Sequence, residues 1–393
     1  MLDLGYNATL VMIGAGLLGI AAGVTGTFLF LRKRSLVSDA ISHSTLPGVG
    51  LAFIVMVAFG GEGRNLFGLM AGSALSAGIG LLCVTWLTTR TRLAEDTAIG
   101  AVLSVFFGAG IVLLTVIQNM SAGRQAGLES FLLGSTAGML RIDALTIAGG
   151  GALVLALVVL LRRPMTLSAF DAEYAASLGL DNRRIDLAMM GLVLGITVVG
   201  LKIVGLIMIV ALLILPPVTA RFWTERSDRV VLIAGLVGGV AGAGGAVISA
   251  SAPALPTGPI IVLSGFALFA LSFLFAPNRG VLAALADHLS FRRRVHLRQG
   301  LLALAQGQPV YEALTLRLLR RAGLIRRDGV ATDAGRAAAA KALLDERRWQ
   351  LLRADLASET AAARYDGLTP IESVLTPDQV ATLDRALRPT VAS

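Results

Sequence analysis

The chain has 393 residues, of which 55% are hydrophobic and only 15% are charged, and its formal net charge is +9. Because soluble domains carry about 25% charged residues, this composition excludes an ordinary soluble enzyme and predicts an integral membrane protein. The single cysteine, Cys83, excludes an intramolecular disulfide and a cysteine-based metal cluster. The opening MLDLGYNATL lacks a basic segment, so we expect no cleavable signal peptide.

Apolar runs of about 20 residues, the length that crosses a bilayer as a helix, recur with short polar breaks up to Pro277. The sixth and seventh runs are separated only by the short connection GLKIVG. The runs predict nine transmembrane helices, at residues 9–31, 36–59, 66–88, 97–119, 142–161, 185–201, 203–222, 230–251 and 259–276.

Lysine and arginine concentrate in the breaks that follow odd-numbered runs, beginning with Arg32, Lys33 and Arg34. Basic residues favour the cytoplasmic side of a membrane. We therefore expect a multi-pass membrane protein with its N-terminus outside and everything after Pro277 in the cytoplasm. Much of the positive net charge is then explained by topology and needs no nucleic-acid partner.

The second run opens with SDAISHSTLPG, which places Asp39 and His43 four residues apart. On a helix these two side chains share a face, and a carboxylate with an imidazole suits Mn, Fe, Zn or Co divalent ions. Ionisable groups inside a membrane segment commonly mark a polar path. The competing interpretation is a solvated pair beside the basic cluster that ends at Arg34.

Two side chains do not complete a coordination shell, so other ligands are required. Water is one candidate, and Pro47 and Gly48 favour a polar path because they disrupt the helical hydrogen-bond ladder. The candidate side chains are Ser42, Ser44, Glu95, Asp96 and Asn119.

Residues 168–187, SAFDAEYAASLGLDNRRIDL, fall in a predicted cytoplasmic break and indicate a short amphipathic helix ended by Gly179. Its apolar face would carry Phe170, Tyr174, Ala175 and Leu178, and suits docking to another protein or to lipid headgroups. Further along, Pro216 and Pro217 predict a disrupted helix at the end of the seventh run.

Residues 281–393 have the composition of a soluble domain, so we expect a transmembrane domain over 1–280 and a cytoplasmic domain over 281–393. In the second domain EALTLRLLRRAGLI has helical periodicity, Gly323 ends that helix, IRRDGVAT predicts a hairpin, and Thr332 caps the next helix. The expected fold class is an all-α polytopic membrane protein with about nine transmembrane helices and a small winged-helix-like domain.

Five ordered blocks together resemble the permease subunits of the ABC-3 group of metal-importing ABC transporters, which take up manganese, zinc and iron. The resemblance covers about residues 8–280. The blocks are LRKRSLVSDAISHSTLPGVGLAF, TRLAEDTAIGAVLSVFFGAGIVLL, FLLGSTAGMLRID, FDAEYAASLGL and GLKIVGLIMIVALLILPPVTARF.

This resemblance implies a multi-pass protein of the bacterial cytoplasmic (inner) membrane, in which Asp39 and His43 contact the transported ion. It also implies that a separate ABC ATPase binds the ATP, and the chain itself lacks a G-x-x-x-x-G-K-[ST] motif. No resident cofactor and no enzymatic activity are then expected of this chain. The implied partners are the ATPase, an extracytoplasmic metal-binding protein, a second permease (identical or a paired homologue) and membrane lipid. The implied ATPase-coupling interface consists of Phe170, Asp171, Glu173, Ala175, Leu178 and Gly179.

The C-terminal text resembles metal-dependent repressors of the diphtheria-toxin-repressor (DtxR) type. It departs from them at the positions of metal ligands, where it has Glu346 and, after Glu372, a serine. A repressor-type metal site is therefore in doubt, although the two glutamates could hold a hard cation weakly. The resemblance to regulators that respond to manganese or iron favours manganese as the cargo, with zinc or iron as alternatives.

Two other functions are compatible with parts of the sequence. A membrane-tethered, metal-responsive DNA-binding regulator would use the arginines of the C-terminal domain on phosphates, but nine spans exceed what a tether needs, and DNA is not expected as a partner. An importer of a chelated metal or organic cargo would not need an Asp–His pair. The arginines are Arg317, Arg320, Arg321, Arg326 and Arg327.

Overall fold

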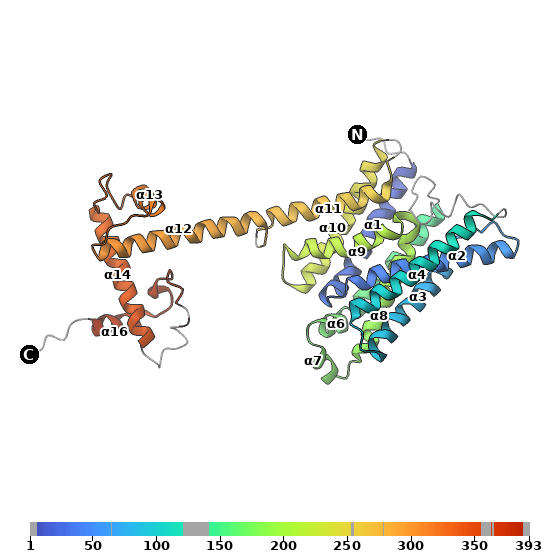
Figure 1. Ribbon diagram of the computed structural model, residues 1–393, viewed down its shortest axis with the longest axis horizontal. Coiled ribbons are helices and arrows are strands. Elements are labelled where there is room, and N and C mark those ends of the chain that lie inside the picture. The colour runs from blue at the N-terminus through green and yellow to red at the C-terminus, as the bar shows by residue number, and fades with distance from the viewer. Residues whose placement is uncertain are drawn as a thin grey trace, which may run out of the picture. The chain divides into compact units, whose positions relative to one another are not determined.

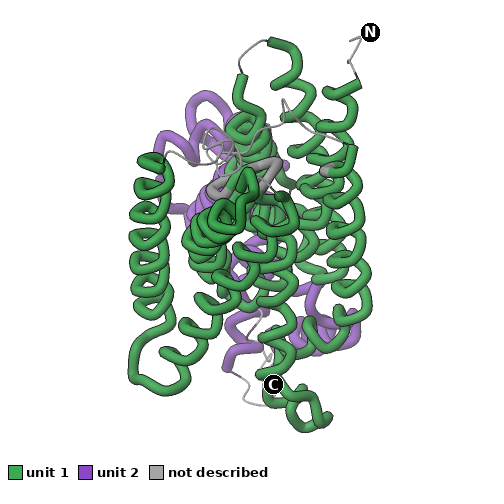
Figure 2. The backbone as a smooth tube through the Cα atoms, turned by 90° about the vertical axis from the view of Figure 1, so that its right-hand side faces the viewer, with its two compact units in different colours: residues 1–281 green, residues 282–393 purple. Residues whose placement is uncertain are grey.

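The computed structural model describes residues 6–63, 65–120, 141–252, 255–277, 279–354, 363 and 365–387. Across these ranges the regular structure is helical and includes no strand. The chain separates into two compact units, residues 1–281 and residues 282–393 (Figure 2). Each unit is taken by itself below.

Unit 1 is a bundle of long apolar helices (Figure 1). Eight of its described helices are long and apolar enough to cross a membrane. The elements are α1 (Tyr6–Leu31), α2 (Leu36–Ala58), α3 (Leu66–Arg90), α4 (Glu95–Gln118), α6 (Arg141–Phe170), α7 (Ala172–Ser177), α8 (Asn182–Val204), α9 (Leu206–Arg221), α10 (Ser227–Ala250) and α11 (Thr257–Phe275).

Eight of the described helices have the length and hydropathy of a span, and the remaining predicted run corresponds to α9, a shorter apolar helix. This helix has 16 residues, about 24 Å at 1.5 Å per residue, which is shorter than the roughly 30 Å hydrocarbon core of a bilayer. The junction between α8 and α9 is Gly205 alone, at φ +79° and ψ 171°. Only glycine adopts that conformation readily, so a continuous apolar sequence bends sharply at this residue.

The two prolines of α9 do not disrupt it, contrary to the sequence prediction. Pro216 and Pro217 lie inside the helix, which continues to Arg221. The ring of Pro216 lies against Gly23 of α1 and Gly238 of α10. Prolines are tolerated in membrane helices where neighbouring helices cover the altered backbone, and these glycine surfaces provide that cover.

Small residues allow α1 and α10 to approach until their backbones touch. A β-carbon placed on Gly19 would lie 2.6 Å from the carbonyl carbon of Gly238, and one on Gly242 would lie 2.7 Å from that of Ala15. Spaced four residues apart, such positions form the small-residue faces through which membrane helices pack. The same packing occurs between α2 and α3, where Gly48 and Gly72 meet.

Unit 2 contains a long helix followed by a small helical cluster. The elements are α12 (Val281–Ala305, whose first residue belongs to unit 1), α13 (Ala313–Arg321), α14 (Asp333–Ala354), the 3-10 turn η2 (Ile371–Ser373) and α16 (Pro377–Leu387).

Local signals in unit 2 agree with the sequence prediction in three places. Gly323 follows α13 at φ +69°. The Thr332 hydroxyl accepts from the Gly335 amide at 3.0 Å and so caps α14. Between the two helices, the Arg326 amide donates to the Val330 carbonyl at 2.8 Å. A single antiparallel bridge joins Ile325 to Ala331, so the predicted hairpin is reduced to a tight turn in the described residues.

Candidate functional site

The predicted Asp–His pair forms on α2. Asp39 lies in the first turn of the helix, where a negative charge is favoured by the helix dipole. One turn later, the His43 Nε2 atom lies 3.4 Å from the Asp39 Oδ1 atom. The Asp39 side chain is 40% exposed and that of His43 is 18% exposed, so the pair is open on its aspartate side.

The separation of these two atoms suits a shared ion. Ligand bonds of about 2.1 Å at tetrahedral angles place neighbouring ligand atoms about 3.4 Å apart. A direct N–H···O hydrogen bond is normally nearer 2.9 Å. A divalent cation could therefore be held between Asp39 and His43 with little movement of either side chain.

The remainder of the imidazole is enclosed. The His43 ring meets the ring of Phe107, on α4, edge to face at a centroid distance of 5.1 Å. Its Nδ1 atom is buried and has no hydrogen-bond partner in the described part of the chain. Phe107 was not predicted from the sequence, because only the packing of α2 against α4 shows that it fixes the orientation of this ring.

Two serines beside the pair are also buried without a partner among the described residues. The hydroxyl groups of Ser42 and Ser44 lack hydrogen bonds there, whereas most buried polar atoms are satisfied. Ser44 faces α3 at Gly80, since a β-carbon on that glycine would meet the serine side chain. These hydroxyls remain chemically suitable for water or an ion.

Pro47 and Gly48 do not interrupt α2, which is helical from Leu36 to Ala58. Gly48 provides the close approach to Gly72 described above. Pro47 has no N–H to donate to the carbonyl of His43, four residues earlier. That carbonyl lacks its usual helical donor, which leaves a backbone acceptor next to the Asp–His pair.

Two of the other predicted ligands, Glu95 and Asn119, interact with groups outside the Asp–His pair. Glu95 lies 3.1 Å from the Arg34 Nε atom, and the Asn119 amide donates to the Thr115 carbonyl of its own helix at 2.9 Å. No group of three or more His, Cys, Asp or Glu side chains that could hold a metal occurs within the described ranges. The block FLLGSTAGMLRID lies mostly outside the described residues.

The predicted coupling segment forms the six-residue helix α7 and its two ends. The Asp171 carboxylate accepts from the Tyr174 amide at 2.8 Å and caps the helix, and Gly179 follows its end at φ +81°. Phe170, Tyr174 and Leu178 are all more than half exposed, whereas Ala175 is fully buried. Ala175 therefore anchors α7 to the bundle, and the exposed apolar face consists of the other three side chains.

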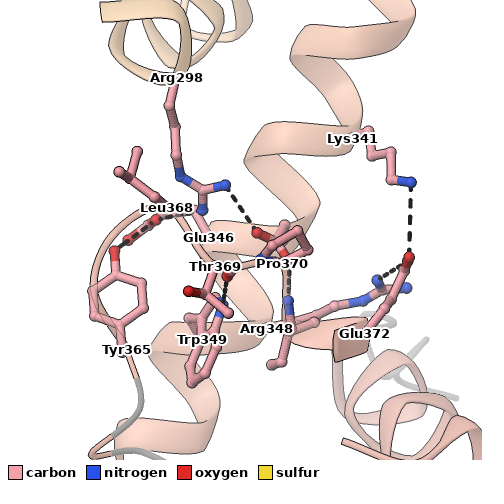
Figure 3. A network of polar contacts seen from close by, with 12 residues as sticks. Arg298, Lys341, Glu346, Arg348, Trp349, Tyr365, Leu368, Thr369, Pro370 and Glu372 are labelled. Carbon is pink, nitrogen blue, oxygen red and sulfur yellow. Dashed lines mark hydrogen bonds and ion pairs between the residues drawn. The ribbon is translucent and has the colours of Figure 1, made fainter. Parts of the chain in front are cut away.

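In unit 2, Glu346 and Glu372 form ion pairs with arginine and lysine side chains (Figure 3). Glu346 lies 3.2 Å from Arg298 and accepts from the Tyr365 hydroxyl at 2.8 Å. Glu372 lies 3.2 Å from Arg348 and 3.7 Å from Lys341. The carboxylates are held by different arginines and do not converge, so they do not fit a shared metal site.

Burial and hydrogen bonding alter the acid–base behaviour of this cluster. Burial raises the pKa of Tyr365, and its hydrogen bond to Glu346 raises it further. Hydrogen bonds from the amides of Leu368 and Thr369 lower the pKa of Asp366. Trp349 lies at the centre of the cluster, fully buried, and its indole donates to the Thr369 carbonyl at 3.0 Å.

Comparison with known proteins identifies the family of unit 1. Residues 6–276 match the profile of the ABC 3 transport family. The chain belongs to the ABC 3 transport family. Among relatives of this family member, "Manganese transport system membrane protein MntC" of Bacillus subtilis is 43% identical over 298 residues, which cover 76% of this chain and 67% of the relative.

Two further matches of this ABC 3 family member extend the comparison. "Zinc transport system membrane protein TroC" of Treponema pallidum is 37% identical over 75% of this chain and 96% of the relative. A solved structure, "PsaBC from Streptococcus pneumoniae in complex with Fab", is 28% identical with a TM-score of 0.61, and covers 70% of this chain and 93% of that one. These matches agree with the family resemblance read from the sequence.

Proposed function

We propose that this chain is the transmembrane permease subunit of an ATP-driven importer of divalent transition metal ions, with manganese favoured over zinc and iron. The observation that carries the proposal is the Asp39–His43 pair, spaced for one ion, on a largely buried helix of a bundle that belongs to the ABC 3 family. Relatives named for manganese and for zinc transport support the class of cargo.

In this mechanism the permease lowers the cost of removing water from the ion and does no covalent chemistry. Asp39 supplies the charge and His43, fixed by Phe107, supplies the nitrogen. Few fixed ligands suit transport, because the ion must leave as well as bind. Alternating exposure of this site to the two sides of the membrane moves the ion inward.

The energy comes from a separate ATPase that docks on α7. Three exposed apolar side chains at this short helix, Phe170, Tyr174 and Leu178, form a surface of the kind that protein partners cover. An extracytoplasmic binding protein delivers the ion, and a second permease completes the path. In this proposal α7 and unit 2 lie in the cytoplasm and the N-terminus lies outside, because basic connections favour the cytoplasmic side.

We also propose that unit 2 is a winged-helix-like domain that does not hold a resident metal. Helix α13, the bridged turn at Ile325–Ala331 and the capped helix α14 support the first part. Arginine pairing of Glu346 and Glu372 supports the second.

The test is metal uptake in cells that express the permease with its ATPase and binding protein. Asp39→Ala and His43→Ala should each lower the initial rate of Mn²⁺ uptake by about tenfold or more, since even outer-shell changes at metal sites cost 10- to 100-fold. Asp228→Ala serves as control, because Asp228 is exposed at the start of α10. Wild-type uptake by both site variants, at equal amounts in the membrane, would refute the assignment.

A further inference from the structure

A partly buried ion network joins four helices at one end of unit 1. Its centre is Asp186 on α8, which accepts from Arg32 through both Nε, at 3.0 Å, and Nη2. Arg34 approaches the second oxygen of Asp186 at 3.2 Å. The side chains of Arg32 and Asp186 are only 16% and 19% exposed. Little water reaches these two charges, so each is compensated mainly by the other.

The turn between α1 and α2 is shaped around this carboxylate. Lys33, which separates the two arginines, has φ +58° and is the one positive-φ residue other than glycine in the described chain. Non-glycine residues rarely adopt this conformation. The double contact with Asp186 keeps the turn in place and thereby sets where α2 begins.

One side of the network leads to α7. Arg32 Nη1 donates to the carbonyl of Ser168, near the end of α6, at 2.8 Å. The Ser168 hydroxyl donates to the Asn182 side-chain oxygen at 2.8 Å, and the Asn182 amide donates to the carbonyl of Ala172 at 2.7 Å. Ala172 is the first residue of α7. Three consecutive hydrogen bonds therefore connect α7 to Arg32.

The other side leads to the helices that hold the Asp–His pair. Arg34 Nε contacts Glu95, the first residue of α4, at 3.1 Å. The Arg34 carbonyl accepts from the Val37 amide at 3.1 Å, so Arg34 is joined to the first turn of α2, the turn that carries Asp39. Both walls of the His43 environment, α2 and α4 with Phe107, are thus attached to the same network.

We propose that Arg32, Arg34 and Asp186 are positioning residues that transmit displacement of α7 to α2 and α4, and so link ATP hydrolysis to the geometry of the Asp39–His43 pair. This inference rests on the proposed function, because it presumes that an ATPase moves α7. Partly buried, mutually satisfied charges hold their elements together, since separating them leaves a charge unpaired. The network provides a contiguous physical connection between the two sites.

The experiment compares Asp186→Asn with the wild type in the complete transporter, reconstituted in vesicles with its ATPase and binding protein. Mn²⁺ uptake and ATP hydrolysis are measured in the same vesicles, with Zn²⁺ as a second arm. We expect the ratio of ions transported to ATP hydrolysed to fall about fivefold or more, the lower end of ordinary coupling between sites, while ATP hydrolysis persists. Asp186→Glu should restore much of the ratio.

The controls separate this role from a structural one. Asp228→Asn, which removes a charge outside the network, should leave the ratio unchanged. If Asp186→Asn does not accumulate in the membrane, Glu95→Gln decides the matter, because its ion pair is about one-third exposed and its loss is milder. If the ratio of ions transported to ATP hydrolysed is unchanged, even with both rates reduced in proportion, the role of the ion network is refuted and the proposed function still stands. A wild type that takes up neither ion overturns the proposed function itself.

Discussion

The packing of α1 against α10 gives a sharp prediction about glycine. A β-carbon on Gly238 would lie 2.1 Å from the carbonyl oxygen of Gly19 and 2.8 Å from its carbonyl carbon, whereas real β-carbons essentially never approach a heavy atom closer than 3.0 Å. Gly238→Ala must therefore separate the two backbones by about 0.9 Å or more (3.0 minus 2.1). Overpacking of this kind costs about 1–3 kcal/mol, and backbone atoms yield less than side chains do.

The matched control lies on the same helix. A β-carbon on Gly244 would meet nothing within 4 Å, so Gly244→Ala should stabilise α10 by about 0.5–1 kcal/mol, the ordinary helical preference for alanine. Thermal unfolding of the two purified variants in detergent should shift in opposite directions from the wild type. Shifts of the same sign and size would refute close backbone contact between α1 and α10.

Two further predictions concern α7 and unit 2. Tyr174→Ser should weaken binding of the purified ATPase by about fivefold or more, as expected for an aromatic side chain at an interface. The control, Tyr311→Ser, changes a highly exposed position in unit 2 and should leave the affinity unchanged. Equal affinities of the two variants for the ATPase would contradict docking at α7. The raised pKa of Tyr365 means that its stabilising contribution is complete below about pH 10, the unfolded value, and is lost as pH rises through the folded value. Tyr365→Phe should remove this component of the pH dependence, measured by unfolding followed through tryptophan fluorescence in a background where Trp86 and Trp223 are replaced by Phe so that Trp349 alone reports; identical pH profiles would contradict it.

The helices could be predicted from sequence because each apolar run is bounded by polar or glycine-rich residues. The Asp39–His43 pairing could also be predicted, since it depends only on the four-residue spacing of a helix. The nine predicted runs correspond to eight described helices of spanning length and to the shorter α9, because hydropathy does not register the helix interruption at Gly205. The effect of Pro216 and Pro217 on α9 was predicted wrongly, because the glycines of α1 and α10 that pack against Pro216 are not evident from the sequence of α9.

The ion network could not be read from the sequence in the same way. Asp186 is 154 residues from Arg32, and no local pattern connects them. A partial signal was available, since Asp186, at the start of the sixth run, follows Arg183 and Arg184 of a break assigned to the same membrane side as the cluster at Arg32–Arg34. Acidic residues among basic cytoplasmic breaks are candidates for such pairs, but their partners emerge only from packing.

The arginine-paired glutamates of unit 2 have a consequence for cells that experience changing metal supply. Because Arg298 and Arg348 provide the positive charge that a bound dication would otherwise provide, we expect this unit to keep its shape in starvation and in excess alike. Unit 2 would then not sense the intracellular concentration of metal through a change in its fold. The rate of metal import would then be adjusted through the amount of transporter that the cell makes or through the rate at which its ATPase hydrolyses ATP.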